Sequence, residues 1–248
     1  MKRLIVEALT IIILLGAVVG WAEANHIHNP NEFISYFRAE SNKVKNCVGN
    51  GKHPYATCIK GEPGLLSGPV SPAQLKASTT ALSSTPTITL DTKAPYVPSE
   101  WQHWLGSPCD VSVQVMEAQG KGVETSKANK CEVVSGTWTS PYDDAKVTDV
   151  NDLTVDNVVP IQYALEAGGA NWPTAQKEKF ANDVSNLAAV STPSQQQKGS
   201  KFPSAWLPTS NYQCQYARIW VNTLKKYSLG VDASDRSALN QALNTCKG

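Results

Sequence analysis

The sequence predicts a mixed α+β protein that is stabilised by disulfides, and three observations lead to this prediction. Residues 99–248 alternate short apolar segments of strand type with longer segments whose apolar residues recur at helical spacing. The chain has 6 cysteines and no C-x-x-C pair, which favours structural disulfides over zinc or thiol redox chemistry. Its 248 residues, 41% of them hydrophobic, allow one sizeable domain and additional segments.

Residues 1–24 are typical of an export signal. Two basic residues precede an apolar run at 8–19, and Ala-Glu-Ala at 22–24 resembles a signal-peptide cleavage site. Residues 4–22 also approach the roughly 20 residues that cross a bilayer, so an uncleaved membrane anchor is the alternative. Either alternative predicts a protein that is secreted or anchored on the extracytoplasmic side, where disulfides persist.

Two further segments precede the main domain, which is expected at 99–248. Residues 25–58 predict a small helical module in which two cysteines close a loop that contains Gly, Asn and Pro. Residues 59–98 are rich in Ser, Thr, Pro and Ala. A segment of that composition buries too little apolar surface to offset its chain entropy, so residues 59–98 are interpreted as a linker.

The strand-type segments of the main domain lie in its first half. Residues 111–116 are short and apolar, and they fit either a helix or a strand. The sequence CEVVSGTW at 131–138 alternates between apolar and polar residues and predicts a strand. The sequence LTVDNVVP at 153–160 predicts a second strand, which ends at Pro160 because proline cannot donate to a strand ladder.

Helices are predicted in the second half. Residues 174–190 follow a proline and predict one helix. A second helix is predicted at 214–230, where Gly230 fits a stop, and a third at 232–246, where Asp232 fits the N-cap. The aromatic residues of this half are expected to pack in the core rather than to stack on bases: Trp206, Tyr212, Tyr216, Trp220 and Tyr227.

The simplest disulfide pairing joins neighbouring cysteines, although the sequence alone does not choose among the possible pairings. This pairing is Cys47–Cys58, Cys109–Cys131 and Cys214–Cys246.

The charge of the chain is close to neutral. The formal net charge is +1, and residues 96–248 carry about 13 Lys and Arg against about 15 Asp and Glu. A dedicated polyanion binder is usually basic, so the charge of this chain does not favour strong electrostatic attraction of nucleic acid. Five lysines could form a phosphate-facing stripe, with a solvated helix face as the ordinary interpretation: Lys177, Lys179, Lys198, Lys225 and Lys226.

Several short motifs resemble one enzyme family in their order and spacing. They are CDVSVQVM (109–116), CEVVSGTWTSPYDD (131–144), VDNVVP (155–160), GGANW (168–172), KFANDVSNLAAVS (179–191), QQQKG (195–199), WLP (206–208) and CQYARIWVNTLKKYSLGV (214–231). Together they are similar to the exported HNH (His-Me finger) endonucleases, including those with a GmrSD-type C-terminal domain. The resemblance implies a ββα finger at Thr154–Lys198, wrapped by helices, in which a divalent cation offsets charge on a phosphodiester.

The residue that carries the chemistry differs from the family pattern. Members of the family have Asp-His where this chain has Asp156 and Asn157. The His takes a proton from the attacking water, and its ordinary pKa of about 6.5 suits that role. An amide has no comparable basicity, so Asn157 can orient a water without accepting its proton. Asp156 remains a candidate metal ligand, and it could equally cap a turn or face solvent.

Four other motif positions depart in the same direction, with an uncharged side chain in each: Ser112, Gln114, Gln195 and Ser200. Asn182, Lys198 and scaffold positions such as Pro160 and residues 206–208 agree with the family pattern. This pattern indicates a fold that was kept while its chemistry was lost. By resemblance, the remaining catalytic-motif positions are Ser112, Gln114, Asn182, Gln195 and Lys198, with Ser200 where the family has Asp.

No obvious residue replaces the lost base. The chain has 4 histidines and none follows His103, which lies in WQHW and is interpreted as a packing residue. Lys198 would need a strongly lowered pKa to act as a base, so a solvated or phosphate-facing role is expected instead. Asn182 and Asn186 are interpreted as helix-surface or backbone-bonding amides rather than ligands.

These observations lead to three hypotheses about function. The first is a pseudo-nuclease with lost or weak catalysis that keeps a binding or structural role. The second is an active metal-dependent DNase or RNase that uses Mg²⁺ or Mn²⁺ and hydrolyses phosphodiester bonds; the first hypothesis needs no cofactor. The third is a surface adhesin or assembly subunit that contacts a protein partner through residues 25–58. Contact with a membrane is expected only through residues 4–22, if they are not cleaved.

Overall fold

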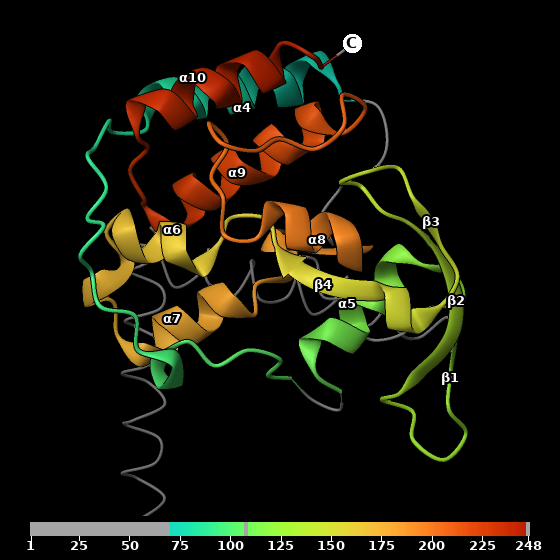
Figure 1. The fold of residues 1–248 in the computed structure, drawn as a ribbon. Coiled ribbons are helices and arrows are strands. Elements are labelled where there is room, and N and C mark those ends of the chain that lie inside the picture. The colour runs from blue at the N-terminus through green and yellow to red at the C-terminus, as the bar shows by residue number, and fades with distance from the viewer. Residues whose placement is uncertain (1–69, 107–108, 247–248) are drawn as a thin grey trace, which may run out of the picture. The chain divides into compact units, whose positions relative to one another are not determined.

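The structure is a computed structural model that describes residues 70–106 and 109–246. The described residues, which are the coloured part of the ribbon in Figure 1, all belong to one unit of the chain that begins at residue 60. The export segment, the module at 25–58 and the predicted Cys47–Cys58 pairing therefore lie outside the described residues. In the described part, no helix is long and apolar enough to cross a membrane.

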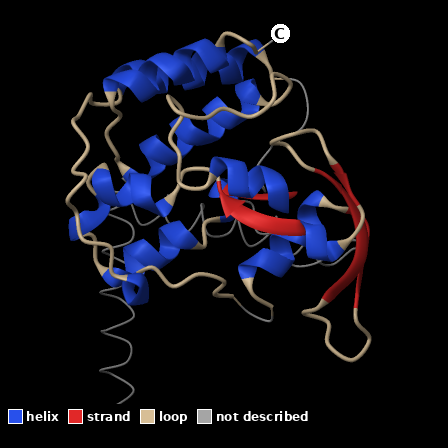
Figure 2. Ribbon diagram, viewed as in Figure 1, coloured by secondary structure: helices blue, strands red, loops and turns tan. Residues whose placement is uncertain are grey.

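The described residues form a mixed α+β fold, as the sequence predicts. They contain seven α-helices and two small antiparallel sheets, and the strands gather on one side of the helices (Figure 2). Short 3-10 helices connect these elements: η1 (Pro98–Glu100), η2 (Val150–Asp152), η3 (Gly169–Asn171) and η4 (Val184–Asn186).

A two-stranded sheet lies at the centre of the described unit. Strand β4 (Leu153–Asn157) pairs antiparallel with β5 (Leu187–Ser191), in a register that sets Leu153 opposite Ser191 and Asn157 opposite Leu187. Every residue of β5 is buried, because helices cover it. Helix α8 (Thr192–Lys198) starts directly after β5, where the Ser191 side chain caps it, and packs on both strands.

Helix α6 (Ile161–Glu166) and helix α7 (Thr174–Ala181) connect the two strands of this sheet. The single helix predicted at 174–190 is wrong in its second half. Helix α7 ends at Ala181, with Asn182 as its C-cap, and residues 187–191 form β5 instead. Pairing with β4 and complete burial override the helical pattern of this short apolar segment.

A layer of three helices covers one side of this centre. Helix α9 (Gln213–Tyr227) packs against α10 (Ala233–Leu243) and α4 (Pro72–Ser84), as Figure 1 shows. The predicted helices at 214–230 and 232–246 are confirmed with small shifts: Ser228, in the left-handed region at φ 54°, ends α9 in place of Gly230. Asp232 is the N-cap of α10, as predicted, and accepts a hydrogen bond from the backbone N–H of Ser234.

Helix α4 corrects the prediction of a linker over the whole of 59–98. Ser71 and Gln74 form a reciprocal capping box at its start, and Pro72 occupies its first turn. Leu82 is fully buried against the α9–α10 pair. After α4 the chain stays attached, since Thr87 forms a parallel bridge with Val231. A polar composition therefore does not prevent this segment from joining the core through a few apolar contacts.

The aromatic residues of the second half pack in the core or against it. Tyr216, Trp220 and Tyr227 are buried, and Trp206 and Tyr212 are partly buried beside them. The predicted Cys214–Cys246 disulfide is present and joins the start of α9 to the segment after α10.

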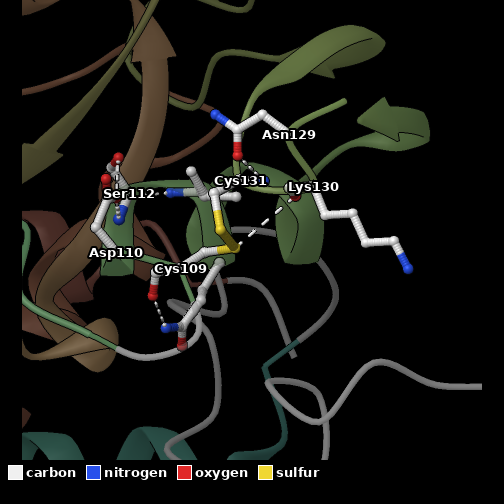
Figure 3. Close-up of a disulfide and its surroundings, with 8 residues drawn as sticks. Cys109, Asp110, Ser112, Asn129, Lys130 and Cys131 are labelled. Atoms are coloured by element: carbon white, nitrogen blue, oxygen red, sulfur yellow. Dashed lines mark hydrogen bonds between the residues drawn. A yellow bond between two sulfur atoms is a disulfide. The ribbon is translucent and has the colours of Figure 1, made fainter. Parts of the chain in front are cut away.

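The second sheet is three-stranded, with the order β1 (Lys121–Thr125), β2 (Val133–Thr139) and β3 (Lys146–Val147). Strand β2 confirms the strand predicted at 131–138. Residues 111–116, left open between helix and strand, belong to helix α5 (Val111–Gln119). Figure 3 shows the predicted Cys109–Cys131 disulfide, which ties the start of α5 to the loop between β1 and β2.

Candidate functional site at the end of strand β4

A cavity of about 390 Å³ opens at the end of β4. This volume lies within the range of about 300–1,000 Å³ that is usual for small-ligand sites. Four segments line the cavity: Tyr96 and His103 before α5, Asp156 and Asn157 of β4, residues 160–162 at the start of α6, and Gln195, Gly199 and Ser200 around the end of α8. The structure thus brings together four of the motif positions that the sequence resemblance selected, although they are far apart in the chain.

Asp156 lies at the buried end of this cavity and is 9% exposed. Its Oδ2 atom accepts a hydrogen bond from the Tyr142 hydroxyl at 2.7 Å and another from the Lys198 ammonium at 2.7 Å. Burial, and next the negative charge of Asp156, raise the pKa of Tyr142 well above its ordinary value. The Tyr142 hydroxyl therefore stays protonated and remains a donor to this carboxylate.

Lys198 has no exposed surface, in contrast to the solvated or phosphate-facing position expected for it. Besides Asp156, its ammonium donates to the backbone carbonyl of Asn157 at 2.9 Å and lies 3.5 Å from that of Gly199. Three oxygen atoms thus surround the ammonium, and the pair with Asp156 is neutral as a whole. The Lys198 ammonium is thus engaged by acceptors that belong to the fold.

The proposed lysine stripe is interrupted, because Lys177 and Lys198 are buried, whereas Lys179, Lys225 and Lys226 are exposed as a solvated helix face requires. Lys177 is buried and makes an ion pair with Glu100 at 2.5 Å, and Lys226 pairs with Asp183 at 2.7 Å. These lysines, together with Lys198, hold segments of the fold to one another. The stripe is therefore corrected to a set of structural ion pairs at these three positions.

Asn157 ends β4 and lines the cavity, where the resemblance places a base. Its Nδ2 donates to the backbone carbonyl of Ala181 at 3.2 Å, which ties the end of β4 to the end of α7. Gln195 reaches the same cavity from α8 and is half-buried, and Ser200 is exposed just after α8. The polar side chains on this side of the cavity are thus amides and a hydroxyl, which donate and accept hydrogen bonds without carrying charge.

His103 lines the cavity as well, so its interpretation as a packing residue is incomplete. It is exposed, and its ring meets that of Trp104 edge to face at a centroid distance of 5.5 Å. The surrounding protein desolvates the imidazolium and lowers the pKa of His103 below its ordinary value. A neutral imidazole therefore lies in the cavity near neutral pH, and no local sequence pattern around His103 indicates this position.

Asn182 lies behind the cavity and fixes the segment that carries His103. Its Oδ1 accepts from the backbone N–H of Leu105 at 2.8 Å, and its Nδ2 donates to the backbone carbonyl of Gln102 at 2.7 Å. It is not among the described residues that line the cavity. Asn182 is thus a backbone-bonding amide, which is one of the two roles that the sequence left open.

Asn186 connects the two strands and is fully buried. Its Oδ1 accepts from the backbone N–H of Val159 at 2.8 Å, and its Nδ2 donates to the carbonyl of the same residue at 3.0 Å. Its backbone carbonyl also accepts from the N–H of Val158 at 2.8 Å. Asn186, rather than Asn182, is therefore the amide that fixes the chain after β4.

Ser112 and Gln114 lie at the start of α5 and are not among the described residues that line the cavity. The Ser112 hydroxyl donates to the Asp110 carboxylate at 2.5 Å, and Gln114 donates to the carbonyl of Cys109 at 2.9 Å (Figure 3). Both side chains thus hold the first turn of α5 beside the Cys109–Cys131 disulfide, and the structure does not bring them to the other motif positions.

The cavity is a poor fit for a divalent cation. Asp156 is the one carboxylate among its described lining residues, and the Lys198 ammonium already occupies one of its oxygens. A positive charge 2.7 Å from that carboxylate repels a second cation. No group of three or more His, Cys, Asp or Glu that could hold a metal occurs in residues 70–106 and 109–246.

Comparison with known proteins gives one relative at high similarity. No family model and no solved structure matches the chain. An "Uncharacterized secreted protein" of Arthroderma benhamiae is 35% identical over 184 residues, which cover 71% of this chain and 89% of that protein. The chain belongs to the family of this fungal protein. The alignment extends over most of both proteins, so the family shares more than one short motif.

Proposed function

We propose that the protein is an exported HNH-like pseudo-nuclease, in which a His-Me-type finger centred on Thr154–Lys198 serves binding rather than hydrolysis. Strands β4 and β5 pair antiparallel and helix α8 packs on both, which supports a finger of ββα type in which α6 and α7 are inserted between the two strands. The single observation that carries the proposal is the state of the two key positions: Asn157 offers no base, and the Asp156 carboxylate is paired with a buried ammonium.

The physical reason is the proton balance of hydrolysis. Water attacks phosphorus effectively only when a group with a pKa near the working pH takes its proton. The Asn157 amide cannot take that proton. The neutral Asp156–Lys198 pair supplies neither a free carboxylate for a metal nor a free cation for the phosphate. The cavity keeps its shape and its hydrogen-bonding side chains, and these suffice for binding.

Export is supported by three independent features. The relative from Arthroderma benhamiae is described as secreted. Residues 1–24 have the pattern of a signal segment. The two disulfides of the described unit require an oxidising compartment in which to form and persist.

A nuclease assay tests the proposal. Purified protein, expressed with its disulfides, is incubated with plasmid DNA and with RNA in the presence of Mg²⁺ or Mn²⁺. We expect no cleavage above buffer for the wild type, and a measurable gain for the combined variant Asn157→His, Gln195→Asn, Ser200→Asp. Wild-type cleavage that disappears in the double variant Asn157→Ala, Gln195→Ala, or in His103→Ala, would contradict the proposal; cleavage that persists in both variants comes from a contaminant.

One observation favours an alternative, an active DNase or RNase. His103 lines the same cavity as Asn157 and is neutral near neutral pH, so it could accept the proton that Asn157 cannot. In that case the wild type cleaves nucleic acid and His103→Ala abolishes cleavage while the circular dichroism spectrum stays unchanged. Equal and negligible activity of the two proteins rules this alternative out.

A further inference from the structure

The charges of the lining residues limit the class of ligand that the cavity can bind. None of its described lining residues is a lysine or an arginine. Its one carboxylate, Asp156, is paired with Lys198. Binding a phosphodiester usually needs cationic side chains or converging backbone N–H groups. A neutral polar ligand can replace its bonds to water by hydrogen bonds to the uncharged lining, whereas an anion would give up its stronger hydration without gaining a counter-charge.

The hydrogen-bonding groups of the cavity are numerous for its size. Gln195 offers an amide, which carries both donors and an acceptor. The amides of Asn157 and Gln162 also line the cavity, and each already donates one hydrogen bond within the protein, to the carbonyl of Ala181 and to the carboxylate of Glu166, so each keeps its oxygen and a second N–H. Ser200 adds a hydroxyl with the same dual capacity. Hydroxyl groups of a ligand also donate and accept, so a ligand that carries several hydroxyls matches this set better than one that only accepts.

The segment that presents His103 is held in a strained conformation. Trp104 has a φ of 58°, in the left-handed region that a bulky L-residue rarely adopts. Asn182 keeps the segment in place with hydrogen bonds on both sides of His103 and Trp104, to Gln102 and to Leu105. Strain of this kind persists only where the surroundings enforce it, and it gathers at binding and active sites.

Tyr96 supplies a flat apolar surface beside these polar groups. It lines the cavity, and 47% of its surface is exposed. An aromatic ring is a large, rigid contact surface that loses little conformational entropy on binding. The C–H face of a pyranose ring has the matching shape and is apolar, while the hydroxyls around its edge remain available to the amides.

We propose that this cavity binds a neutral saccharide, with His103, Asn157 and Gln195 as hydrogen-bonding contacts, Tyr96 as a stacking surface and Asn182 as the residue that positions His103. The proposal rests on the binding role proposed above and names the ligand class for the same cavity. At about 390 Å³ the cavity holds one or two sugar units.

The test is a binding experiment with the full, disulfide-bonded chain. Saturation-transfer NMR and calorimetry are run with cellobiose, N,N′-diacetylchitobiose and mannobiose, beside a thymidine dinucleotide and inorganic phosphate as anionic probes. We expect at least one disaccharide to bind and both anions to fail. His103→Ala and Gln195→Ala should each weaken binding by about tenfold, as loss of one good hydrogen bond does. Gln196→Ala is the matched control, because Gln196 is the exposed neighbour of Gln195 and does not line the cavity.

The positioning role of Asn182 needs a separate measurement. Asn182→Ala should weaken disaccharide binding and also shift the imidazole resonances of His103 in the free protein, whereas Asn182→Asp, which keeps the acceptor for Leu105, should restore part of both. Unchanged imidazole resonances in Asn182→Ala would remove Asn182 from the proposal.

Two results overturn the ligand class. One is the absence of binding for all three disaccharides at millimolar concentration, and the other is binding of the dinucleotide that His103→Ala abolishes. Both leave the pseudo-nuclease proposal intact provided that no cleavage occurs. Cleavage of nucleic acid in the nuclease assay would contradict the pseudo-nuclease proposal, regardless of whether a disaccharide binds. Failure of the ligand class and failure of the proposed function are therefore distinguishable.

Discussion

The two sides of the cavity differ in what their polar groups do. At its buried end, the lining residue Asp156 is hydrogen-bonded to Lys198 and Tyr142, and all three are buried. On its other side, Gln195, Ser200 and His103 are half-buried or exposed. The charged pair thus connects segments of the fold, and the more exposed lining is made of amides, a hydroxyl and an imidazole. Under the proposed function, Asp156 and Lys198 keep the residue types of the motif and serve the fold instead of hydrolysis.

The largest effect is expected from breaking the buried pair at the buried end of the cavity. Lys198→Met leaves the Asp156 carboxylate buried without its counter-charge, and we expect a loss of about 3–5 kcal/mol in the free energy of unfolding. The double variant Lys198→Met, Asp156→Asn removes both charges and keeps an acceptor for Tyr142, so it should recover most of the loss. Urea unfolding followed by tryptophan fluorescence measures both. A single variant as stable as the wild type would show that the pair contributes nothing.

A smaller effect is expected at Asn186. Asn186→Ala leaves the buried N–H and carbonyl of Val159 without their partners, which should cost about 2–3 kcal/mol. Asn157→Ala is the matched control, because this asparagine makes one longer bond to Ala181 and should cost at most about 1 kcal/mol. Equal losses of unfolding free energy for the two variants would show that the lining residue Asn157 stabilises the fold as much as the buried Asn186 does.

Near-zero change in stability is expected at Gln195. Its side chain lines the cavity, and its backbone carbonyl accepts from the Gly199 N–H, a bond that an alanine keeps. Gln195→Ala should therefore change the free energy of unfolding by no more than about 0.5 kcal/mol. The same urea titration checks it. A loss of unfolding free energy comparable to that of Asn186→Ala would mean that the Gln195 side chain also stabilises the fold.

The smallest effect concerns pH. Because folding lowers the pKa of His103, the unfolded chain binds the proton more tightly, and stability falls as the pH drops below about 6.5 until it levels off below the folded pKa. His103→Gln removes this contribution. The difference in urea midpoint between wild type and variant should therefore shift slightly between pH 7.5 and pH 5, in favour of the variant at low pH. A shift in the opposite direction would show that the imidazolium is stabilised in the folded protein.

Local patterns were sufficient for the elements that depend on local sequence. The strand predicted at 153–160 is present but shorter, since β4 ends at Asn157 and Pro160 precedes α6. Asp232 caps α10, and both described disulfides join cysteines that are neighbours in the chain. These features follow from turn, capping and alternation rules, which need only a few adjacent residues. The mixed α+β class follows from the same rules.

The features that the sequence did not reveal depend on distant partners. Lys198 is buried because Asp156, 42 positions earlier, meets its ammonium, and nothing near Lys198 in the chain indicates this. Helix α4 lies in a polar segment and is recruited by contacts of Leu82 with α9 and α10. His103 is held at the cavity because Asn182, the C-cap of α7, hydrogen-bonds the backbone of Gln102 and Leu105 on either side of it. Such contacts are decided by tertiary packing, which overrides local propensity.

The side chain of Asn186 has a consequence for how the chain opens and closes. A strand normally frays at its end, and its last amide protons exchange with solvent through small local openings. Here an asparagine side chain imitates a peptide group and extends the ladder beyond Asn157, as far as Val159. The deuterium uptake of the Val158 and Val159 amides should therefore be as slow as that of the strand interior. The segment that follows β4 would then exchange only when the whole domain unfolds.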